Sequence, residues 1–262
     1  MQLDENWHVN APWAQLVCTT QVPEDIFNTV LKLTDEIYDD PEHDSAGAGL
    51  AGQIHEEYYF TDEKLVESGL MEYFIEMSTK YWHTVLTNGN MHEYLDQNYP
   101  NGPHGFNWAA KIVSCWTVHQ FENEYNPIHK HSNCKISAVM HIKYPDKVEP
   151  AVKEHLKGLD GNLIFTGMGA ADPFCTAPVL NVKSNNVGWL HLFPASLGHS
   201  VYPFKGVGER RSLSFNADMI SLPELEFIKK MEEKGHIETE EDVKQRHLGA
   251  ITGRGVTVNE IG

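Results

Sequence analysis

Apolar residues recur at helical spacing in two stretches near the start of the chain. The first stretch follows Pro23, which is suited to the first turn of a helix, and ends before Pro41. Its apolar positions are Ile26, Phe27, Val30, Leu33 and Ile37. A second stretch with the same spacing covers residues 70–85. The pattern predicts two helices, each with one apolar face that packs against a core.

From about Trp108 the pattern changes to short runs that are rich in Val, Ile, Phe and Trp. Turn-forming Gly, Pro and Asn residues separate these runs, and no long helical pattern lies between them. The runs are KIVSCWTVHQF, KISAVMHIKY, NLIFTG, VGWLHLF and RSLSFNADM. Several strands at this spacing are typical of an all-β sandwich or barrel and argue against a parallel sheet of βαβ units.

We therefore expect a mainly β protein with flanking helices. Residues 1–107 would form a helical region packed on the barrel, and residues 108–220 would form the β core. After residue 220 a capping-box pattern of Ser221 and Glu224 predicts a return to helix, so residues 221–262 would hold C-terminal helices and a Gly-rich tail. A chain of 262 residues that is 41% hydrophobic can bury a sizeable core.

The charge is strongly acidic and unevenly distributed. The net charge is −17, of which residues 1–100 carry −16, residues 101–220 carry +2 and residues 221–262 carry −3. An acidic front end indicates helices with solvated acidic faces. This balance argues against a protein that binds nucleic acid.

The cysteines and the start of the chain indicate the compartment. Cys18, Cys115, Cys134 and Cys175 include no closely spaced pair, which favours free thiols in a reducing compartment. The start MQLDENWHVN lacks the basic and apolar regions of a signal peptide, and no apolar run reaches the length of a membrane span. We expect a cytoplasmic protein without a membrane segment, and its oligomeric state is open.

Histidines concentrate in the predicted β core. Eight of the 15 lie between His104 and His199. His129 and His131 are two residues apart, so on an extended segment both side chains point the same way and can bind one metal ion. In a jelly roll, strands far apart in sequence lie side by side, so His199, which follows a strand and a turn, could complete such a site. Taken singly, His199 could equally be a structural turn residue.

A second candidate lies in the segment ERRSLSFNAD. On a strand, Arg210 would share one face with Ser212, Ser214 and Asn216, while bulky apolar residues would occupy the other face. A buried guanidinium is costly unless it is paired. A dicarboxylate ligand would pair it through two parallel hydrogen bonds, and a protein carboxylate or solvent would be the alternatives.

Taken in this order, the motifs resemble the iron- and 2-oxoglutarate-dependent oxygenases, in the prolyl-hydroxylase-like branch found in bacteria and phages. The resemblance covers about residues 108–218, and the segment LAGQIHEEYYF at 50–60 is similar to the front end of the family. It is carried by Trp116, Pro127, His129, His131, Ser137, Pro145, Phe193, Pro194, His199 and the run Arg210 to Asn216.

The resemblance implies a double-stranded β-helix (jelly roll) that binds Fe(II), 2-oxoglutarate as cosubstrate and O2. His129, His131 and His199 would be the metal ligands. Arg210, helped by Ser212, would bind the far carboxylate of 2-oxoglutarate. The implied reaction is hydroxylation of a small-molecule or peptide substrate, such as a prolyl or other amino-acid residue.

One position departs from the commonest pattern of such sites, which is two histidines and one carboxylate. The second ligand position holds His131 here. A third neutral ligand would leave the site one unit more positive. Alternatively, Glu122 or Glu124 completes the site and His131 lies outside the ligand set.

Two other classes of protein remain as alternatives. A cupin-like metalloenzyme also has a His-x-His pair, but it needs a Glu shortly afterwards, where this chain has Lys135 and Ile136. A cupin also gives no reason for Arg210 and Ser212. A non-enzymatic jelly roll with a binding or structural role would bind no metal.

Overall fold

The computed structural model describes residues 15–87, 108–149, 159–166 and 186–221, together with Glu226, Lys229 and Lys230. The Gly-rich end and Cys175 lie outside these residues, as does most of the expected C-terminal helical region. The three cysteines that are described are free thiols.

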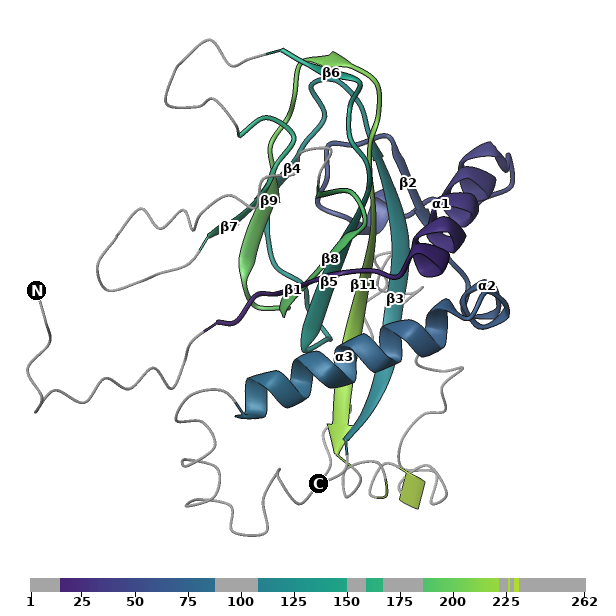
Figure 1. Ribbon diagram of the computed structural model, residues 1–262, viewed down its shortest axis with the longest axis vertical. Coiled ribbons are helices and arrows are strands. Elements are labelled where there is room, and N and C mark those ends of the chain that lie inside the picture. The colour runs from purple at the N-terminus through teal and green to yellow at the C-terminus, as the bar shows by residue number, and fades with distance from the viewer. Residues whose placement is uncertain are drawn as a thin grey trace, which may run out of the picture.

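A six-stranded antiparallel sheet forms the larger wall of the molecule (Figure 1). The strand order across it is β1-β8-β5-β11-β3-β2. The strands are β1 (Cys18–Gln21), β2 (Glu56–Tyr59), β3 (Trp108–Gln120), β5 (Ile136–Lys143), β8 (Trp189–Pro194) and β11 (Arg210–Ser221). Neighbours in this order lie far apart in the sequence, as is typical of a jelly roll.

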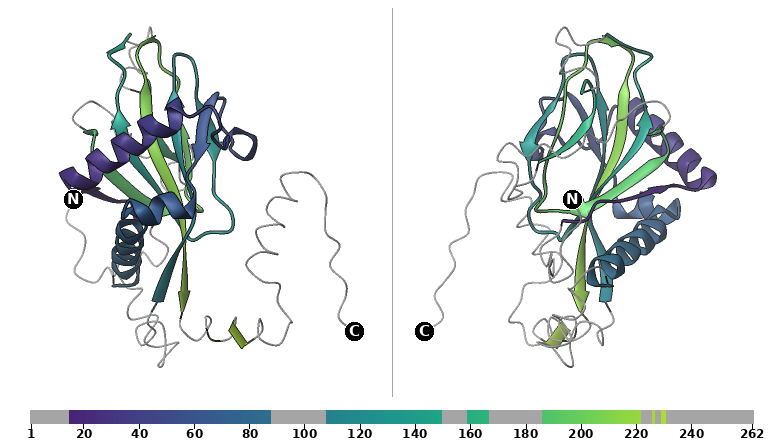
Figure 2. Two further views of the ribbon diagram at one scale, coloured as in Figure 1. Left: turned by 90° about the vertical axis from the view of Figure 1, so that its right-hand side faces the viewer. Right: turned by 60° about the vertical axis from the view of Figure 1, so that its left-hand side comes forward.

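A three-stranded sheet faces the larger one (Figures 1 and 2). Its order is β4-β9-β7, with β4 at Asn126–His129, β7 at Leu163–Thr166 and β9 at Gly198–Val201. A short ribbon pairs β6 (Lys147–Val148) with β10 (Gly206–Val207). An apolar layer joins the two sheets through Val139, Leu163, Phe165, Phe193, Leu197 and Val201. The fold is the double-stranded β-helix that the sequence implied.

Both predicted helices cover the outer face of the larger sheet (Figure 2). They are α1 (Glu24–Asp39) and α3 (Leu70–Thr87), which confirms the two helical patterns. A short helix, α2 (Asp62–Glu67), precedes α3, and Thr61 caps it by accepting a hydrogen bond from the Lys64 N–H. None of the helices in the described part of the chain is long and apolar enough to cross a membrane.

Strand β11 separates polar from apolar residues on its two faces. Leu213 and Phe215 are fully buried against the helices, and the Phe215 ring stacks on Phe74 of α3 at 4.5 Å between ring centroids. Arg210 and Ser212 point to the opposite face, into the space between the sheets. The alternation predicted for this strand is therefore confirmed.

The front segment also contributes two strands that the pattern analysis did not predict. β1 pairs with β8 at one edge of the large sheet, and β2 pairs with β3 at the other edge. Each strand has only four residues, CTTQ and EEYY, and half of them or more are polar. Such short segments give too little alternation to identify a strand. The region before residue 108 thus extends the β core as well as packing on it.

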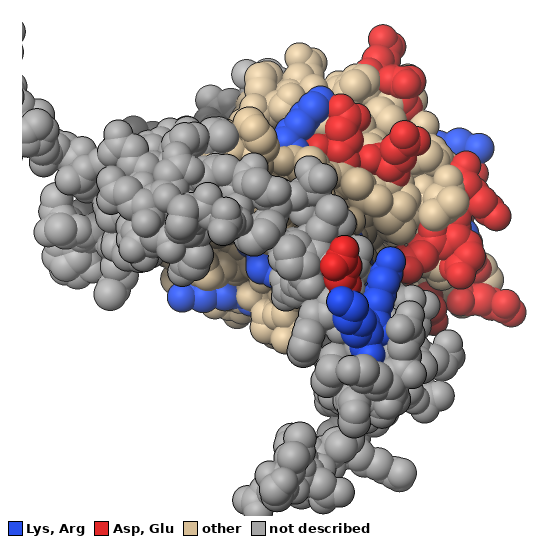
Figure 3. Space-filling view, turned by 90° about the horizontal axis from the view of Figure 1, so that it is seen from below, with Lys and Arg blue, Asp and Glu red and all other residues tan. Residues whose placement is uncertain are grey.

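The acidic side chains of the front segment gather on the side of the molecule where α1 and α2 lie (Figure 3). Those on α1 and α2 that are exposed include Glu24, Asp25, Glu36, Asp39, Asp62, Glu63 and Glu67. This confirms solvated acidic helix faces for the described part of the front segment. The apolar face of α1 packs on the outer face of the sheet, so the sheet lies between its acidic face and the interior of the barrel.

Candidate active site

Three histidines converge at one end of the barrel. His129 ends β4 and pairs directly with His199 of β9, because these strands are antiparallel neighbours. His131 follows two residues after His129, just beyond the strand. The nearest ligand atoms of all three side chains lie within 4.8 Å of one another. The fold therefore brings together the three residues that the sequence singled out as metal ligands.

Backbone carbonyls fix the orientation of two of these rings. The Nδ1 atom of His129 lies 2.8 Å from the Pro127 carbonyl oxygen, and that of His199 lies 2.9 Å from the Leu197 carbonyl oxygen. A carbonyl can only accept, so each Nδ1 carries the proton and each Nε2 presents a lone pair. Such contacts orient metal-binding histidines in proteins.

The third ring points its Nε2 atom at the same place. His131 Nε2 lies 3.2 Å from His199 Nε2, so two imidazole nitrogens face each other at close range. Burial lowers the pKa of His131 to about 4, and burial together with the neighbouring His129 lowers the pKa of His199 to about 3. Neutral imidazoles with converging lone pairs suit a divalent transition metal, so the donor set fits iron.

The carboxylates that could have completed the site are engaged elsewhere. Glu124 accepts hydrogen bonds from the Phe121 N–H and from His55, and Glu122 accepts one from the Gly206 N–H. Among the described residues, the cluster of potential metal ligands contains only the three histidines. Neither glutamate reaches it.

Arg210 is buried inside the barrel without a carboxylate partner among the described residues. Its side chain is 1% exposed, and its Nε donates to the Gly161 carbonyl oxygen at 2.8 Å. Nη1 lies 3.5 Å from Ser212 Oγ, while Nη2 has no partner. Burial lowers the pKa of Arg210 to about 10, so the side chain remains charged at neutral pH.

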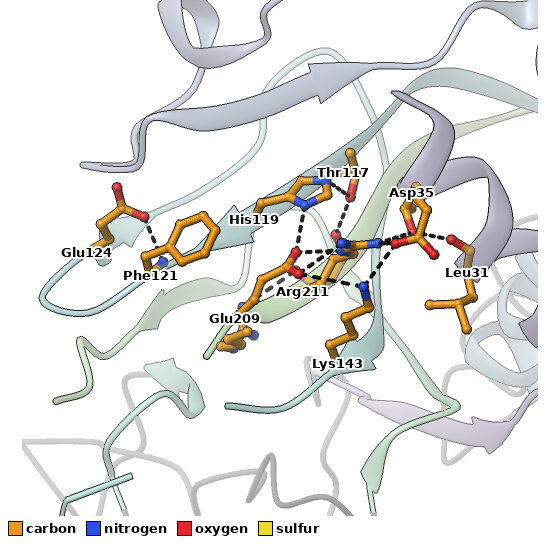
Figure 4. Close-up of polar contacts among 12 residues, drawn as sticks. Leu31, Asp35, Thr117, His119, Phe121, Glu124, Lys143, Glu209 and Arg211 are labelled. Carbon is orange, nitrogen blue, oxygen red and sulfur yellow. Dashed lines mark hydrogen bonds and ion pairs between the residues drawn. The ribbon is translucent and has the colours of Figure 1, made fainter. Parts of the chain in front are cut away.

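The next residue in the same strand, Arg211, is an arginine that is paired with carboxylates (Figure 4). Arg211 binds Glu209 through Nε and Nη2 at 2.5 and 2.8 Å, and its Nη1 binds Asp35 of α1 at 2.6 Å. His119 and Lys143 also contact Glu209. This cluster on the outer face links α1 to the sheet, whereas Arg210 on the inner face keeps a free donor.

The three histidines and Arg210 line one cavity of about 140 Å³. Ser212 and Ser214 also line it, and Val139, Leu163 and Val201 give it apolar walls. The front segment supplies another part of the wall, through Gly49, Leu50, Ala51 and Glu57. A cavity with converging ring nitrogens, a free guanidinium donor and apolar walls can hold a metal ion together with a small dicarboxylate.

Sequence reasoning missed two buried histidines near Arg210. His141 lies opposite Ser212 across β5 and β11, and its ring centroid is 5.0 Å from that of His191 in β8. Burial, with a smaller effect of the Arg210 charge, lowers the pKa of His141, and burial lowers that of His191 to about 4. A histidine ring is neutral or positive but never negative, so neither ring compensates the Arg210 charge. The sequence shows one histidine within each apolar strand, but the strand pattern does not indicate which residues surround it.

Among solved structures, the chain is similar to a prolyl-4-hydroxylase from Pseudomonas putida, with 15% identity over 76% of this chain and 91% of that one and a TM-score of 0.42. It is also similar to a prolyl hydroxylase from Trichoplax adhaerens, in complex with a hypoxia inducible factor peptide fragment. The identity is 10% over 77% of this chain and 83% of that one, and the TM-score is 0.46. A third similar structure is HygX from Streptomyces hygroscopicus, with nickel, 2-oxoglutarate and hygromycin B bound. Its identity is 8% over 78% of this chain and 82% of that one, and the TM-score is 0.41.

No curated protein matches the chain. A family model does match: residues 114–216 correspond to the family described as putative 2OG-Fe(II) oxygenase. This segment runs from β3 to β11 and includes all three histidines, Arg210 and Ser212. The match gives no support to either of the two alternatives, a cupin-like metalloenzyme or a non-enzymatic jelly roll. The segment 114–216 is therefore similar to the family of putative 2OG-Fe(II) oxygenases, whose name implies 2-oxoglutarate and Fe(II).

Proposed function

We propose that His129, His131 and His199 hold the iron, and that Arg210, assisted by Ser212, binds the far carboxylate of 2-oxoglutarate. One observation carries this assignment. The Arg210 guanidinium is buried in the cavity that the three histidines line, it has a free Nη2, and no described carboxylate pairs with it. A bound carboxylate would supply the missing acceptor.

The bound iron, 2-oxoglutarate and O2 supply the oxidising chemistry, in which the cosubstrate is converted to succinate and CO2 while a C–H bond is hydroxylated. The protein's own residues prepare the site. The backbone carbonyls behind His129 and His199 hold the rings in the tautomer that leaves Nε2 free. The apolar side chains of Val139, Leu163 and Val201 exclude water around the cosubstrate chain.

The charges in the cavity support a doubly negative cosubstrate. Three neutral imidazoles leave the full charge of the metal ion in place, and Arg210 adds a positive charge that no described protein carboxylate neutralises. A cosubstrate with two carboxylates therefore compensates both centres. The third histidine thus strengthens, rather than weakens, the attraction for an anionic cosubstrate.

For the substrate, we propose a small molecule or a side chain presented by a peptide. The Gly49–Ala51 stretch of the front segment lines the same cavity as the proposed metal and cosubstrate residues. The loop that follows the short 3-10 helix η1 (Gly47–Gly49) thus forms part of the wall that a substrate would meet.

Calorimetric titration under nitrogen tests the assignment of Arg210. 2-Oxoglutarate is added to the Fe(II)-loaded protein, and Arg210→Ala is compared with Lys205→Ala, which removes an equal charge at an exposed position. We expect Arg210→Ala to weaken binding by about 100-fold, because charged hydrogen bonds are lost, and Lys205→Ala to bind as the wild type does. Equal binding by both variants would contradict the assignment.

A further inference from the structure

Glu57 is the acidic side chain that lines the cavity in the described part of the chain. It lies on β2, opposite Val118 of β3, and both residues contribute to the cavity wall. Glu57 is only 1% exposed, and its Oε2 atom has no hydrogen-bond partner. Within the described residues it forms no ion pair. A buried carboxyl oxygen without a partner is costly to the fold, which points to a ligand that supplies the partner.

The surroundings of Glu57 keep its carboxyl group at the cavity. A Cβ atom on Gly52 would lie 3.2 Å from Glu57 Oε1 and 2.5 Å from Oδ1 of Asn126, which also lines the cavity. The loop can approach these two polar groups only because Gly52 has no side chain. Backbone hydrogen bonds hold the loop in place, from Ala46 N–H to the Glu57 carbonyl and from Gln53 N–H to the Tyr125 carbonyl.

Glu57 has neither of the ordinary roles of a buried carboxylate. It is not a member of the cluster of potential metal ligands, which contains the three histidines. It does not neutralise Arg210, whose described contacts are Gly161 and Ser212. Burial raises the pKa of Glu57 to about 7, with a smaller contribution from the charge of Glu124, as expected for a carboxyl group that lacks a compensating cation.

We propose that Glu57 determines substrate specificity by binding a cationic nitrogen, such as an ammonium or guanidinium group, on the compound that is hydroxylated. This inference rests on the proposed function, because Glu57 lines the same cavity as Arg210 and Ser212, in the same sheet, with Ser212 and Glu57 both paired with Val118 of β3. A cation supplies the N–H donors that Oε2 lacks and the charge that an ionised buried carboxyl requires. The substrate class is therefore an amine, a basic amino acid or a basic side chain of a peptide.

The test measures binding of two kinds of cationic probe to the Fe(II)- and 2-oxoglutarate-loaded protein under nitrogen. Free lysine and arginine represent small molecules, and short peptides with blocked ends and one Lys or Arg represent protein substrates. Matched probes with Glu in place of the basic residue are the anionic comparison. Titration calorimetry reports binding, and succinate release in air reports whether each probe stimulates turnover.

The variant Glu57→Gln keeps the shape of the side chain and removes its charge. Glu56→Gln is the matched control, since Glu56 is the neighbouring residue on β2 and does not line the cavity. We expect at least one class of cationic probe to bind better than its anionic counterpart. We also expect Glu57→Gln, but not Glu56→Gln, to weaken that binding by about ten-fold or more. Thermal melting of each variant checks that it is folded.

The outcomes separate this inference from the proposed function. If the wild type binds 2-oxoglutarate but binds the anionic probes as well as the cationic ones or better, or if Glu57→Gln binds cations as the wild type does, the role of Glu57 is wrong and the cosubstrate site stands. If the wild type fails to bind 2-oxoglutarate, the proposed function itself is wrong. Stimulation by free amino acids alone or by peptides alone identifies the source of the cationic group.

Discussion

Two consecutive arginines of β11 lie in opposite environments, because neighbouring residues of a strand face opposite sides of the sheet. Arg211 is balanced by the carboxylates of Glu209 and Asp35, as a buried ion pair in a stable fold requires. Arg210 has a carbonyl and a hydroxyl as partners and retains a free donor. The contrast within one strand indicates that Arg210 has a donor free to bind a ligand, whereas Arg211 already has its partners within the protein.

The contact between Arg210 and Ser212 leads to a graded prediction. Ser212 Oγ lies 3.5 Å from Arg210 Nη1, which is at the long end for a hydrogen bond. We expect Ser212→Ala to weaken 2-oxoglutarate binding by about three- to ten-fold, well short of the effect of Arg210→Ala. Anaerobic titration of the cosubstrate measures this. A loss as large as that of Arg210→Ala would mean that Ser212, rather than the guanidinium, dominates binding.

The lowered pKa of Glu209 predicts how the free energy of unfolding depends on pH. Despite the cost of its burial, the hydrogen bonds from His119 and Arg211 lower its pKa to about 2, from an ordinary value of 4.5. The ionised carboxylate therefore stabilises the fold above about pH 4.5, and this contribution is lost as the pH falls from about 4.5 to about 2. We expect the free energy of unfolding of Glu209→Gln to fall less than that of the wild type over this range.

Urea denaturation between about pH 6 and pH 3 measures the effect of Glu209. The exposed Glu72→Gln serves as the control and should follow the wild-type pH dependence. If Glu209→Gln loses stability with acid as steeply as the wild type does, the ionised carboxylate does not contribute in the way described.

At the scale of elements, the core of the large sheet depends on contacts between β11 and α3. Phe215 and Phe74 are both fully buried and stack at 4.5 Å between ring centroids. We expect Phe215→Ala to lower the free energy of unfolding by about 3–5 kcal/mol, as other buried phenylalanines do. Val207→Ala, at a position that is 64% exposed, should change it by less than about 0.5 kcal/mol. Urea denaturation measures both, and similar values for the two would contradict the assigned core.

The local spacing of apolar and polar residues correctly predicted those helices and strands whose structure follows from that spacing. The spacing of apolar residues identified α1 and α3, and the alternation of RSLSFNAD identified both faces of β11. The pairing of His129 with His199 could be anticipated only through the jelly-roll topology, because it joins positions 70 residues apart in β4 and β9. Once the topology was inferred, the histidine cluster followed.

The features that the sequence did not reveal arise from tertiary packing. Glu57 lies in a four-residue strand with two tyrosines and a second glutamate, and nothing in that pattern marks one glutamate as buried. His141 and His191 read as ordinary members of apolar strands. Their roles depend on which residues the opposite strand places beside them, and this cannot be read from spacing along the chain.

At the scale of the whole molecule, the acidic charge and the proposed anion site are separated. The acidic faces of α1 and α2 lie outside the large sheet (Figures 1 and 3). Arg210 and the three histidines line the cavity inside the barrel. The described part of the near-neutral segment 101–220 supplies most of the cavity lining, and Glu57 is the acidic side chain that the front segment adds to it, even though the whole chain carries −17. An acidic protein can thus hold a doubly negative ligand.

This arrangement predicts stabilisation by ligands. Molecules that bind only the folded state raise the free energy of unfolding by about 2.7 kcal/mol when present at a hundred times their Kd. We expect Fe(II) to raise the midpoint of anaerobic thermal unfolding and 2-oxoglutarate to raise it further, with reversal by a chelator. In Arg210→Ala the metal should still stabilise the fold, but the added effect of 2-oxoglutarate should largely disappear. An equal added effect in this variant and in the wild type would contradict the site.

The three histidines and Arg210 are proposed to form one site for iron and cosubstrate. An anaerobic absorbance titration tests it most directly, because iron chelated by 2-oxoglutarate gives a charge-transfer band that neither component gives alone. We expect the band in the wild type only when both are present, and we expect its loss in His199→Ala. Absence of the band from the wild type, or an unchanged band in His199→Ala, would contradict the claim.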